Sequence, residues 1–383
     1  MPVWNFVRRN AYQDSVTLMR LTHDMEAVAG VHRAAAMMGT PPNRALLAQA
    51  GLLHPDGETA GPVDLVIAVV ADCAAAAEAA CAVAEALLAA PAPGSAGGAP
   101  RPRTLDGGLR ALAGATLALI SVPGAYAGAE ARRALDAGLH VMLFSDNVPL
   151  DTEVELKRVA IQRGLFLMGP DCGTAILAGV PLGFANVVPR GRIGLVGASG
   201  TGLQEVTCRL AAEGEGVSHA IGVGGRDLSD AVGGIMTLAA LGALAGEPTT
   251  EVVVVVGKTP GSTVAARLVE ALGTLGKPAV VYTGGPTGQA PPGITVTTSG
   301  RAPVHRAETL EDAALAAVAL ARGEAPRTVE FTRPAPEIEQ LVTEQSRALG
   351  PGQRFVRGVY AGGTLAWEAV SLLGACLPGT QCR

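Results

Sequence analysis

A glycine-rich turn between two regular segments is the clearest candidate for chemistry in this sequence. Ile193 to Val196 predicts a buried strand, Gly197-Ala-Ser-Gly-Thr-Gly202 a turn, and residues 203–213 a helix. That order points free backbone N–H groups and the positive end of a helix at one place, which suits an anion. The spacing fits neither the dinucleotide fingerprint nor a Walker A loop, and a tight strand–helix connection is the plainer alternative. The predicted phosphate-binding residues are Gly197, Ser199, Gly200, Thr201 and Gly202.

A second glycine turn follows the next predicted strand, 218–223. It predicts further anion-binding residues, namely Gly222, Gly224 and Gly225. Arg226 beside them can pair bidentately with a carboxylate or phosphate, and Lys258 ends the strand 251–257. For both cations an exposed position without a ligand is an equal alternative. Carboxyl ends of parallel strands share one edge of a sheet, so these groups are expected to lie together.

Strands alternate with helices through most of the chain, which predicts α/β architecture with doubly wound parallel sheets. Residues 1–90 predict a β-α-β-(α)-β-α order, typical of a small ferredoxin-like module. Predicted strands near the carboxyl end of the chain are 294–298 and 354–360. The predicted domains and linkers are 1–90 (module), 91–103 (linker), 104–189 and 190–323 (two Rossmann-like domains), 324–353 (linker), and 354–383 (the start of an incomplete third domain).

Composition excludes several classes of function. A net charge of −5, with Lys and Arg scattered, gives no basic surface for nucleic acid. No signal peptide opens the chain and no apolar run approaches the ~20 residues of a membrane helix, so we expect a cytoplasmic protein. The six cysteines and six histidines show no metal-ligand spacing, so we predict free thiols and no metal site.

Residues 104 to 285 resemble the α subunit of succinyl-CoA synthetase. Within that acyl-CoA synthetase superfamily the chain is most similar to the FdrA family. The motifs that carry the first resemblance are Ser145-Asp-Asn-Val-Pro149, Met168-Gly-Pro-Asp-Cys-Gly173, Gly191-Arg-Ile-Gly-Leu-Val-Gly-Ala-Ser-Gly-Thr201 and Ile221-Gly-Val-Gly-Gly225. Those that carry the second are Tyr12-Gln-Asp-Ser-Val-Thr-Leu-Met19, Met37-Met-Gly-Thr40 and Gly358-Val-Tyr-Ala-Gly-Gly-Thr-Leu365.

The resemblance implies a CoA-binding-type domain at 104–189 and a flavodoxin-like ligase domain at 190–323. It implies CoA or an adenine nucleotide as the candidate cofactor, although the strand 63–70 ends without the family's glycine loop. Gln204 stands where the synthetase has a substrate-contacting tyrosine, and Cys172 stands where it also has a cysteine, which we interpret as packing. The implied CoA or nucleotide cleft comprises Ser121, Val122, Pro123, Ser145, Asp146 and Asn147.

The synthetase carries its phosphoryl group on a histidine in a loop after the fourth strand of its second domain. The matching segment here, 282–293, contains no histidine, and Lys258 replaces the glutamate that orients the histidine in the family. His305 is the nearest histidine and is expected in a surface loop. The sequence therefore predicts no phosphohistidine relay.

Our interpretation is an FdrA-like subunit of a multi-subunit transferase that acts on an acyl or carbamoyl phosphate, similar to oxamate carbamoyltransferase. The predicted catalytic residues are Lys258, Arg226 and Gln204. The expected partners are a small anionic substrate with a carboxylate acceptor, and either other enzyme subunits or further copies of the chain. One alternative is an ADP-forming acyl-CoA synthetase similar to succinyl-CoA ligase, and another is a non-catalytic scaffold or regulatory subunit.

Overall fold

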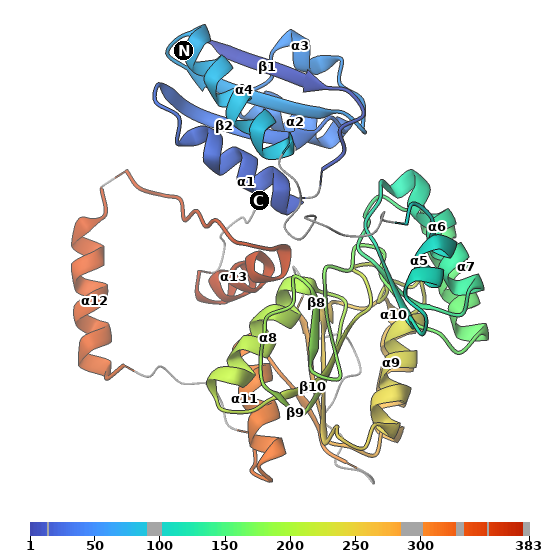
Figure 1. Ribbon diagram of the computed structural model, residues 1–383. Coiled ribbons are helices and arrows are strands. Elements are labelled where there is room, and N and C mark those ends of the chain that lie inside the picture. The colour runs from blue at the N-terminus through green and yellow to red at the C-terminus, as the bar shows by residue number, and fades with distance from the viewer. Residues whose placement is uncertain (14, 90–101, 285–301, 327–332, 351, 378–383) are drawn as a thin grey trace. The chain divides into compact units, whose positions relative to one another are not determined.

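The computed structural model describes residues 1–13, 15–89, 102–284, 302–326, 333–350 and 352–377 (Figure 1). The chain forms two compact units, Met1–Ala111 and Leu112–Arg383. The predicted linker 91–103 lies almost wholly outside the described residues, as does the predicted strand 294–298. No helix among the described residues is long and apolar enough to cross a membrane.

The first unit is a three-stranded antiparallel sheet covered by helices. The sheet order is β1-β3-β2. The central strand β3 is almost entirely buried, because its alternate side chains pack into separate cores on the two faces. The bounds are β1 (Val3–Arg8), α1 (Ser15–Glu26), β2 (Val31–Met38), α2 (Pro41–Gln49), α3 (Pro55–Glu58), β3 (Leu65–Ala71), α4 (Ala74–Ala89) and α5 (Leu105–Ala111). From β1 to α4 the strands and helices therefore follow one another as β-α-β-α-α-β-α, and the sheet has three strands.

The second unit begins with a small parallel sheet in the order β4-β5-β6. Its helix α6 packs through small side chains one turn apart, Ala127, Ala131 and Ala134, all fully buried. The bounds are β4 (Leu117–Ile120), α6 (Gly124–Asp136), β5 (His140–Leu143), α7 (Leu150–Gln162) and β6 (Leu167–Met168).

A seven-stranded sheet follows, in the order β13-β12-β11-β9-β10-β7-β8. Strands β9 to β13 run parallel, and β11 is a run of buried valines, as expected of a strand covered on both faces. The bounds are β7 (Thr174–Leu177), β8 (Val180–Gly183), β9 (Arg190–Gly197), α8 (Gly200–Ala212), β10 (Val217–Gly222), α9 (Ile235–Gly246), β11 (Val252–Lys258), α10 (Ser262–Thr274), β12 (Ala279–Gly284), β13 (Val304–Arg306) and α11 (Leu310–Ala321).

The fold class, an α/β chain with parallel sheets, is confirmed. The strand pairing adds one feature that was not predicted: the β7–β8 hairpin pairs antiparallel with β10. Residues 174–183 were predicted to belong to the first Rossmann-like domain, but they form the edge of the second sheet. Because β10 exposes an edge there, the hairpin satisfies backbone groups that would otherwise lack partners.

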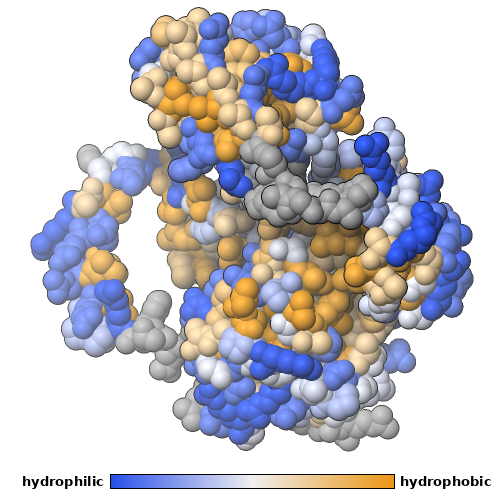
Figure 2. Space-filling model, viewed as in Figure 1, coloured by the Kyte–Doolittle hydropathy of each residue, from blue (hydrophilic) through white to orange (hydrophobic). Residues whose placement is uncertain are grey.

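The carboxyl-terminal segment consists of two helices, α12 (Ala335–Ala348) and α13 (Gly363–Cys376). The surface of α12 is mostly hydrophilic (Figure 2), and none of its described residues is buried. The strand predicted at 354–360 does not form: these residues are exposed and pair with no described strand. His305 was expected in a loop but lies on the short strand β13, where it pairs with Val280 of β12.

Candidate functional site

The first predicted anion turn is the N-terminus of α8. Ser199 is the N-cap, with extended backbone, and its Oγ accepts a hydrogen bond of 3.0 Å from the N–H of Gly202. The N–H groups of Gly200 and Thr201, the first helical residues, have no carbonyl partner within the helix. This turn therefore has the free donors and helix dipole that the sequence predicts.

The N-terminus of α13 lies directly against this turn. Thr364, which is buried, places its Oγ1 2.5 Å from Ser199 Oγ. Gly362, the N-cap of α13, approaches Thr201 so closely that a Cβ on it would lie 2.4 Å from Thr201 Cγ2. The site is thus bounded by the amino ends of two helices, one of which the sequence interpretation had assigned to an incomplete domain.

Glu368 holds α13 in this place. Its carboxylate accepts a 2.7 Å hydrogen bond from the N–H of Leu310, the first residue of α11, and another from the hydroxyl of Tyr282 on β12. Burial raises the pKa of both Tyr282 and Glu368. The helix α13 is therefore docked on three elements of the second unit: the helices α8 and α11 and the strand β12.

The second glycine turn, 222–225, packs against the turn that follows β6. A Cβ on Gly222 would lie 2.4 Å from the Thr174 carbonyl oxygen, and one on Gly224 would lie 2.5 Å from the Pro170 oxygen. Gly224 also has φ +88°, a conformation that favours glycine. Close backbone packing thus explains these two glycines. Gly225 is more open, since the nearest atom to its Cβ position is 3.7 Å away.

The two glycine turns are joined to each other. The N–H of Val223 donates a 2.8 Å hydrogen bond to the Gly197 carbonyl. Gly197 itself faces the helix, where a Cβ would lie 2.4 Å from Leu203 Cγ. The structure therefore brings together the predicted phosphate-binding stretches 197–202 and 222–225, as their positions at neighbouring strand ends predicted.

The strand ends predicted to form a CoA or nucleotide cleft also meet. Ser145 is buried, and its Oγ accepts a 3.0 Å hydrogen bond from the N–H of Val122. Its carbonyl accepts one from the N–H of Asp171. Pro123 is the N-cap of α6, Asn147 has a positive φ of 53°, and a Cβ on Gly124 would lie 2.3 Å from the Asp146 oxygen.

The predicted catalytic residues have different surroundings. Gln204 Nε2 donates a 2.8 Å hydrogen bond to Thr174 Oγ1, so its amide joins α8 to β7. Arg226 forms a 2.8 Å ion pair with the buried Glu153 and donates to the Val148 carbonyl. Arg226 already neutralises a protein carboxylate, and its contact with substrate stays a prediction.

Lys258 is exposed at the carboxyl end of β11, and the structure shows no ion pair for it with another described residue. Its charge acts on a carboxyl group that the sequence interpretation missed, that of Asp171. Loss of solvent and the nearby Asp146 raise the pKa of Asp171, while Lys258 and Arg226 oppose that change. Lys258 is therefore available to a ligand at this edge.

Cys172 is a packing residue in this geometry. Its side chain is 3% exposed, and its Sγ lies 3.5 Å from the Gly222 carbonyl oxygen. Burial raises the pKa of the thiol to about 12, so the reactive thiolate is not formed near neutral pH.

A buried charge cluster lies under the second glycine turn. Lys157 of α7 is fully buried, and its Nζ donates to Glu153 (2.8 Å), Asp227 (2.7 Å) and the Val223 carbonyl (3.0 Å). Asp227 also accepts hydrogen bonds from the N–H groups of Met236 and Thr237 at the start of α9. Lys157 thereby fixes the backbone of the 222–225 turn.

Sequence reasoning missed several of these residues, above all Thr364, Glu368 and Lys157. A signal for Thr364 was present, because Gly362-Gly363-Thr364 before an apolar run repeats the small-residue helix start seen at 199–202. Lys157 carried no signal beyond its helical position. No group of three or more His, Cys, Asp or Glu side chains in the described ranges is arranged to hold a metal ion.

Two protein families match parts of the chain. Residues 1–102 match the AllF heavy metal-associated domain, and residues 189–285 match the CoA binding domain. The second match covers the part that the sequence interpretation assigned to the ligase-type domain, and not 104–189. The match begins with β9, the glycine turn and α8, the strand–turn–helix unit typical of the start of a Rossmann domain.

One nearly full-length relative is YahF of Escherichia coli K12, a protein of uncharacterised function. It is 38% identical over 375 residues, which cover 97% of this chain and 69% of YahF. The chain belongs to the YahF family.

A more distant relative of this YahF-family chain is the α subunit of the ADP-forming succinate–CoA ligase of Staphylococcus aureus. It is 32% identical over 160 residues, 40% of this chain and 50% of the ligase subunit. The chain thus spans about half the length of that subunit. Together with the CoA-binding match, the likeness places the YahF-family chain in the acyl-CoA synthetase superfamily.

Among solved structures, one similar chain is an acetyl-coenzyme A synthetase of Candidatus Korarchaeum cryptofilum in complex with phosphate and ADP. It is 19% identical, with a TM-score of 0.43, and the match covers 54% of this chain and 48% of that one.

Proposed function

We propose that this chain is a subunit of an enzyme of the ADP-forming acyl-CoA ligase type, and that it binds the phosphate group of an acyl phosphate. The observation that carries the proposal is the meeting of the α8 and α13 N-termini at Ser199 and Thr364. The first N–H groups of each helix have no carbonyl partner within that helix, and the two positive dipole ends lie next to each other there, which favours a phosphate dianion. The succinate–CoA ligase relative and the CoA-binding match support a thioester as the other product.

The chemistry follows from these groups. The CoA sulfur attacks the acyl carbon, the bond from that carbon to the phosphate oxygen breaks, and inorganic phosphate leaves with the bonding electrons. The thiol proton passes to solvent. Donors at the two helix ends stabilise the charge that grows on the leaving phosphate, and Lys258 adds a cation at the same edge of the sheet.

This proposal needs no phosphorylated side chain on the present chain. The segment 282–293 contains no histidine, and His305 lies on β13, 3.9 Å from Asp312. Transfer of the phosphoryl group from ATP, which releases ADP, would then fall to another subunit. The candidate cleft for CoA is formed by 121–123 and 145–147, whose turns meet at the Ser145 hydroxyl.

Membership of the FdrA family, and carbamoyl transfer in particular, is a finer proposal. Carbamoyl phosphate carries the same phosphate group as an acyl phosphate, so the same two helix ends would bind it. The distinction lies in the acceptor, because thioester formation requires CoA and carbamoyl transfer does not.

Substitutions at Ser199 test the site. Asn and Asp are both good N-caps, so Ser199→Asn and Ser199→Asp keep the start of α8 but differ by one negative charge. We expect wild type and Ser199→Asn to bind acetyl phosphate and inorganic phosphate with similar affinity, measured by calorimetry. We expect Ser199→Asp to bind at least about tenfold more weakly, which corresponds to about 1.4 kcal/mol.

If Ser199→Asn and Ser199→Asp bind phosphate with equal affinity, the anion does not bind at Ser199. If the wild-type protein binds neither phosphate nor acetyl phosphate, the result favours a non-catalytic scaffold role. Product analysis under turnover distinguishes thioester formation from carbamoyl transfer. Acetyl phosphate with CoA should yield a thioester, whereas consumption of carbamoyl phosphate by a carboxamide acceptor without CoA would favour the FdrA-type transfer.

A further inference from the structure

A cavity of about 250 Å³ lies between the two sheets of the second unit, away from the anion site. His140, Phe166 and Met168 come from the small sheet, and Leu177, His219 and Ile221 come from the large one. The carboxyl-terminal part of α9 closes it with Ala243, Leu244 and Glu247. Since α9 runs back along the sheet, this cavity lies towards the amino ends of the strands, whereas the anion turns follow the carboxyl ends.

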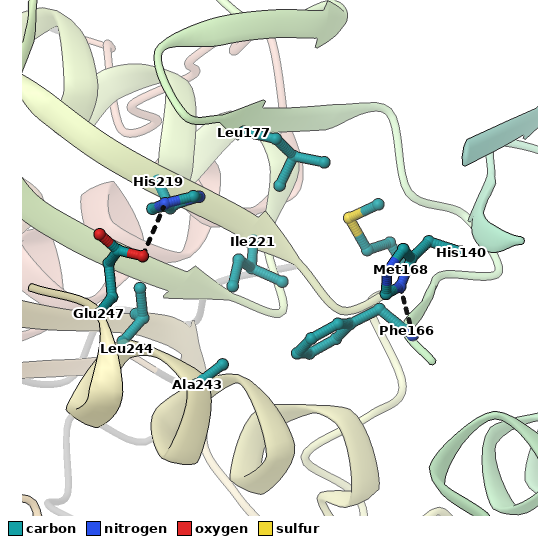
Figure 3. Close-up of a pocket in the computed structure, with 9 residues that line it drawn as sticks. All are labelled: His140, Phe166, Met168, Leu177, His219, Ile221, Ala243, Leu244 and Glu247. Atoms are coloured by element: carbon teal, nitrogen blue, oxygen red, sulfur yellow. Dashed lines mark hydrogen bonds and ion pairs between the residues drawn. The ribbon is translucent and has the colours of Figure 1, made fainter. Parts of the chain in front are cut away.

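The walls are mostly carbon, with polar groups at two sides. Figure 3 shows His219 and Glu247 together on one side, and His140, Phe166 and Met168 together on the other. An apolar cavity of roughly 150 Å³ is enough for benzene in other proteins, so this one has room for a bicyclic aromatic molecule. Side chains of His219 and Glu247 are 22% and 30% exposed, so solvent reaches that side.

The His219–Glu247 pair has unused hydrogen-bonding capacity. His219 Nδ1 accepts a 3.2 Å hydrogen bond from the N–H of Ala178, so in the neutral ring the proton is on Nε2. Burial lowers the pKa of His219, which favours that neutral ring. Its Nε2 lies 3.8 Å from Glu247 Oε2, which is too far for a direct hydrogen bond.

Glu247 is arranged as an acceptor. Its Oε1 accepts hydrogen bonds from the N–H and the hydroxyl of Thr249, and these bonds lower the pKa of the carboxyl group, so it is ionised at neutral pH. The second oxygen, Oε2, faces the Nε2 proton of His219 across the 3.8 Å gap. A hydroxyl group can lie within hydrogen-bonding distance of both atoms, accepting from His219 and donating to Glu247.

We propose that this cavity is a binding site for a neutral aromatic molecule that carries a hydroxyl group. The ring system packs against Phe166, Met168 and Ile221, and the hydroxyl group bridges His219 and Glu247. A ligand carboxylate in the same place would be repelled by the Glu247 carboxylate and has no proton to donate to it in a hydrogen bond. Anionic analogues therefore bind more weakly. The bound molecule contacts both sheets, and its binding raises the melting temperature of the second unit.

Calorimetric titration with 2-naphthol tests the site, with 2-naphthoate as the anionic analogue of the same size. We expect one 2-naphthol per chain and binding of 2-naphthoate at least tenfold weaker. Ala243→Phe fills the cavity from an exposed position on α9, and we expect it to weaken 2-naphthol binding at least tenfold. Ala266→Phe, at an exposed position on α10 outside the cavity, is the matched control and should bind as wild type does.

A third variant, Glu247→Ala, removes the carboxylate that accepts the hydrogen bond of the ligand. We expect it to lower the affinity for 2-naphthol and to reduce the preference for 2-naphthol over 2-naphthoate. Equal melting temperatures of the two phenylalanine variants would show that both fold. Two outcomes would contradict the proposed binding site: no binding of 2-naphthol by the wild-type protein, or equal binding of 2-naphthol by wild type and Ala243→Phe. Equal affinity of the wild type for 2-naphthol and 2-naphthoate would contradict the hydroxyl bridge between His219 and Glu247. Neither result bears on phosphate binding at Ser199, so the two proposals fail separately.

Discussion

At the level of single residues, the buried Lys157 connects the small sheet to the large one. It lies on α7, and its three hydrogen bonds end on Glu153 of the same helix, Asp227 and the Val223 carbonyl. Arg226 adds a further cation to Glu153. The sequence interpretation predicted that Arg226 contacts substrate. A charged residue beside a glycine turn has the same sequence pattern whether its partner is a ligand or a buried carboxylate.

Replacing Lys157 by Met should destabilise the second unit strongly. The methionine fills a similar volume but leaves two buried carboxylates, Glu153 and Asp227, without their shared cation. Removing one partner of a buried ion pair typically costs about 3–5 kcal/mol. Urea unfolding should show that loss, and Arg158→Met, at the exposed neighbouring position, should change the free energy of unfolding by less than about 0.5 kcal/mol.

A loss below about 1 kcal/mol for Lys157→Met would show that the carboxylates find other partners or protons. Binding of phosphate gives a second readout, since the Val223 carbonyl that Lys157 holds belongs to the glycine turn at the anion site.

At the level of elements, the position of α13 decides how the anion site is built. Its amino end lies on the α8 turn through Thr364, and its second turn is held by Glu368. Neither contact could be predicted from local sequence, which indicated a strand at 354–360 followed by a separate unit. Residues 354–360 pair with no described strand, and α13 docks on α8, α11 and β12 without one.

Glu368→Leu should release α13 while the rest of the sheet stays folded. The substitution removes the acceptor for the Leu310 N–H and for the Tyr282 hydroxyl, and an unpartnered buried group costs about 1–3 kcal/mol. Hydrogen exchange should therefore become faster across 363–376 and at the start of α11. Glu339→Leu, at an exposed position on α12, should leave the exchange of both segments unchanged.

Unchanged exchange in 363–376 for Glu368→Leu would mean that Thr364 and the apolar contacts suffice to hold the helix. In that case the anion site would still include both helix ends.

At the level of the whole molecule, the chain consists of two compact units with separate hydrophobic cores. Leu65 of β3 and Leu195 of β9 are both fully buried, one in each unit. The first unit resembles a heavy metal-associated domain, and the second contains the candidate anion site and the cavity. Their cores share no described residue, so each can lose its packing alone.

Single core truncations should therefore affect one unfolding transition at a time. Leu65→Ala and Leu195→Ala each remove a fully buried side chain, at a cost of about 2–5 kcal/mol. Differential scanning calorimetry should show that each variant lowers a different transition. Were both variants to lower one shared transition equally, the two units would unfold as a single cooperative block.

The sequence alone determined most of the strands and helices of the parallel sheets, because apolar periodicity and glycine positions act over a few residues. It also predicted that the turns at 145–149 and 169–173 meet at the edge of one sheet, and those at 197–202 and 222–225 at the edge of another, since parallel strands share a carboxyl edge. Only the tertiary structure decided which side chains complete the site. Thr364 reaches Ser199 across 165 positions and Lys157 reaches Asp227 across 70, and no local spacing encodes contacts of that range. The same holds for the β7–β8 hairpin, whose sheet is chosen by the free edge of β10.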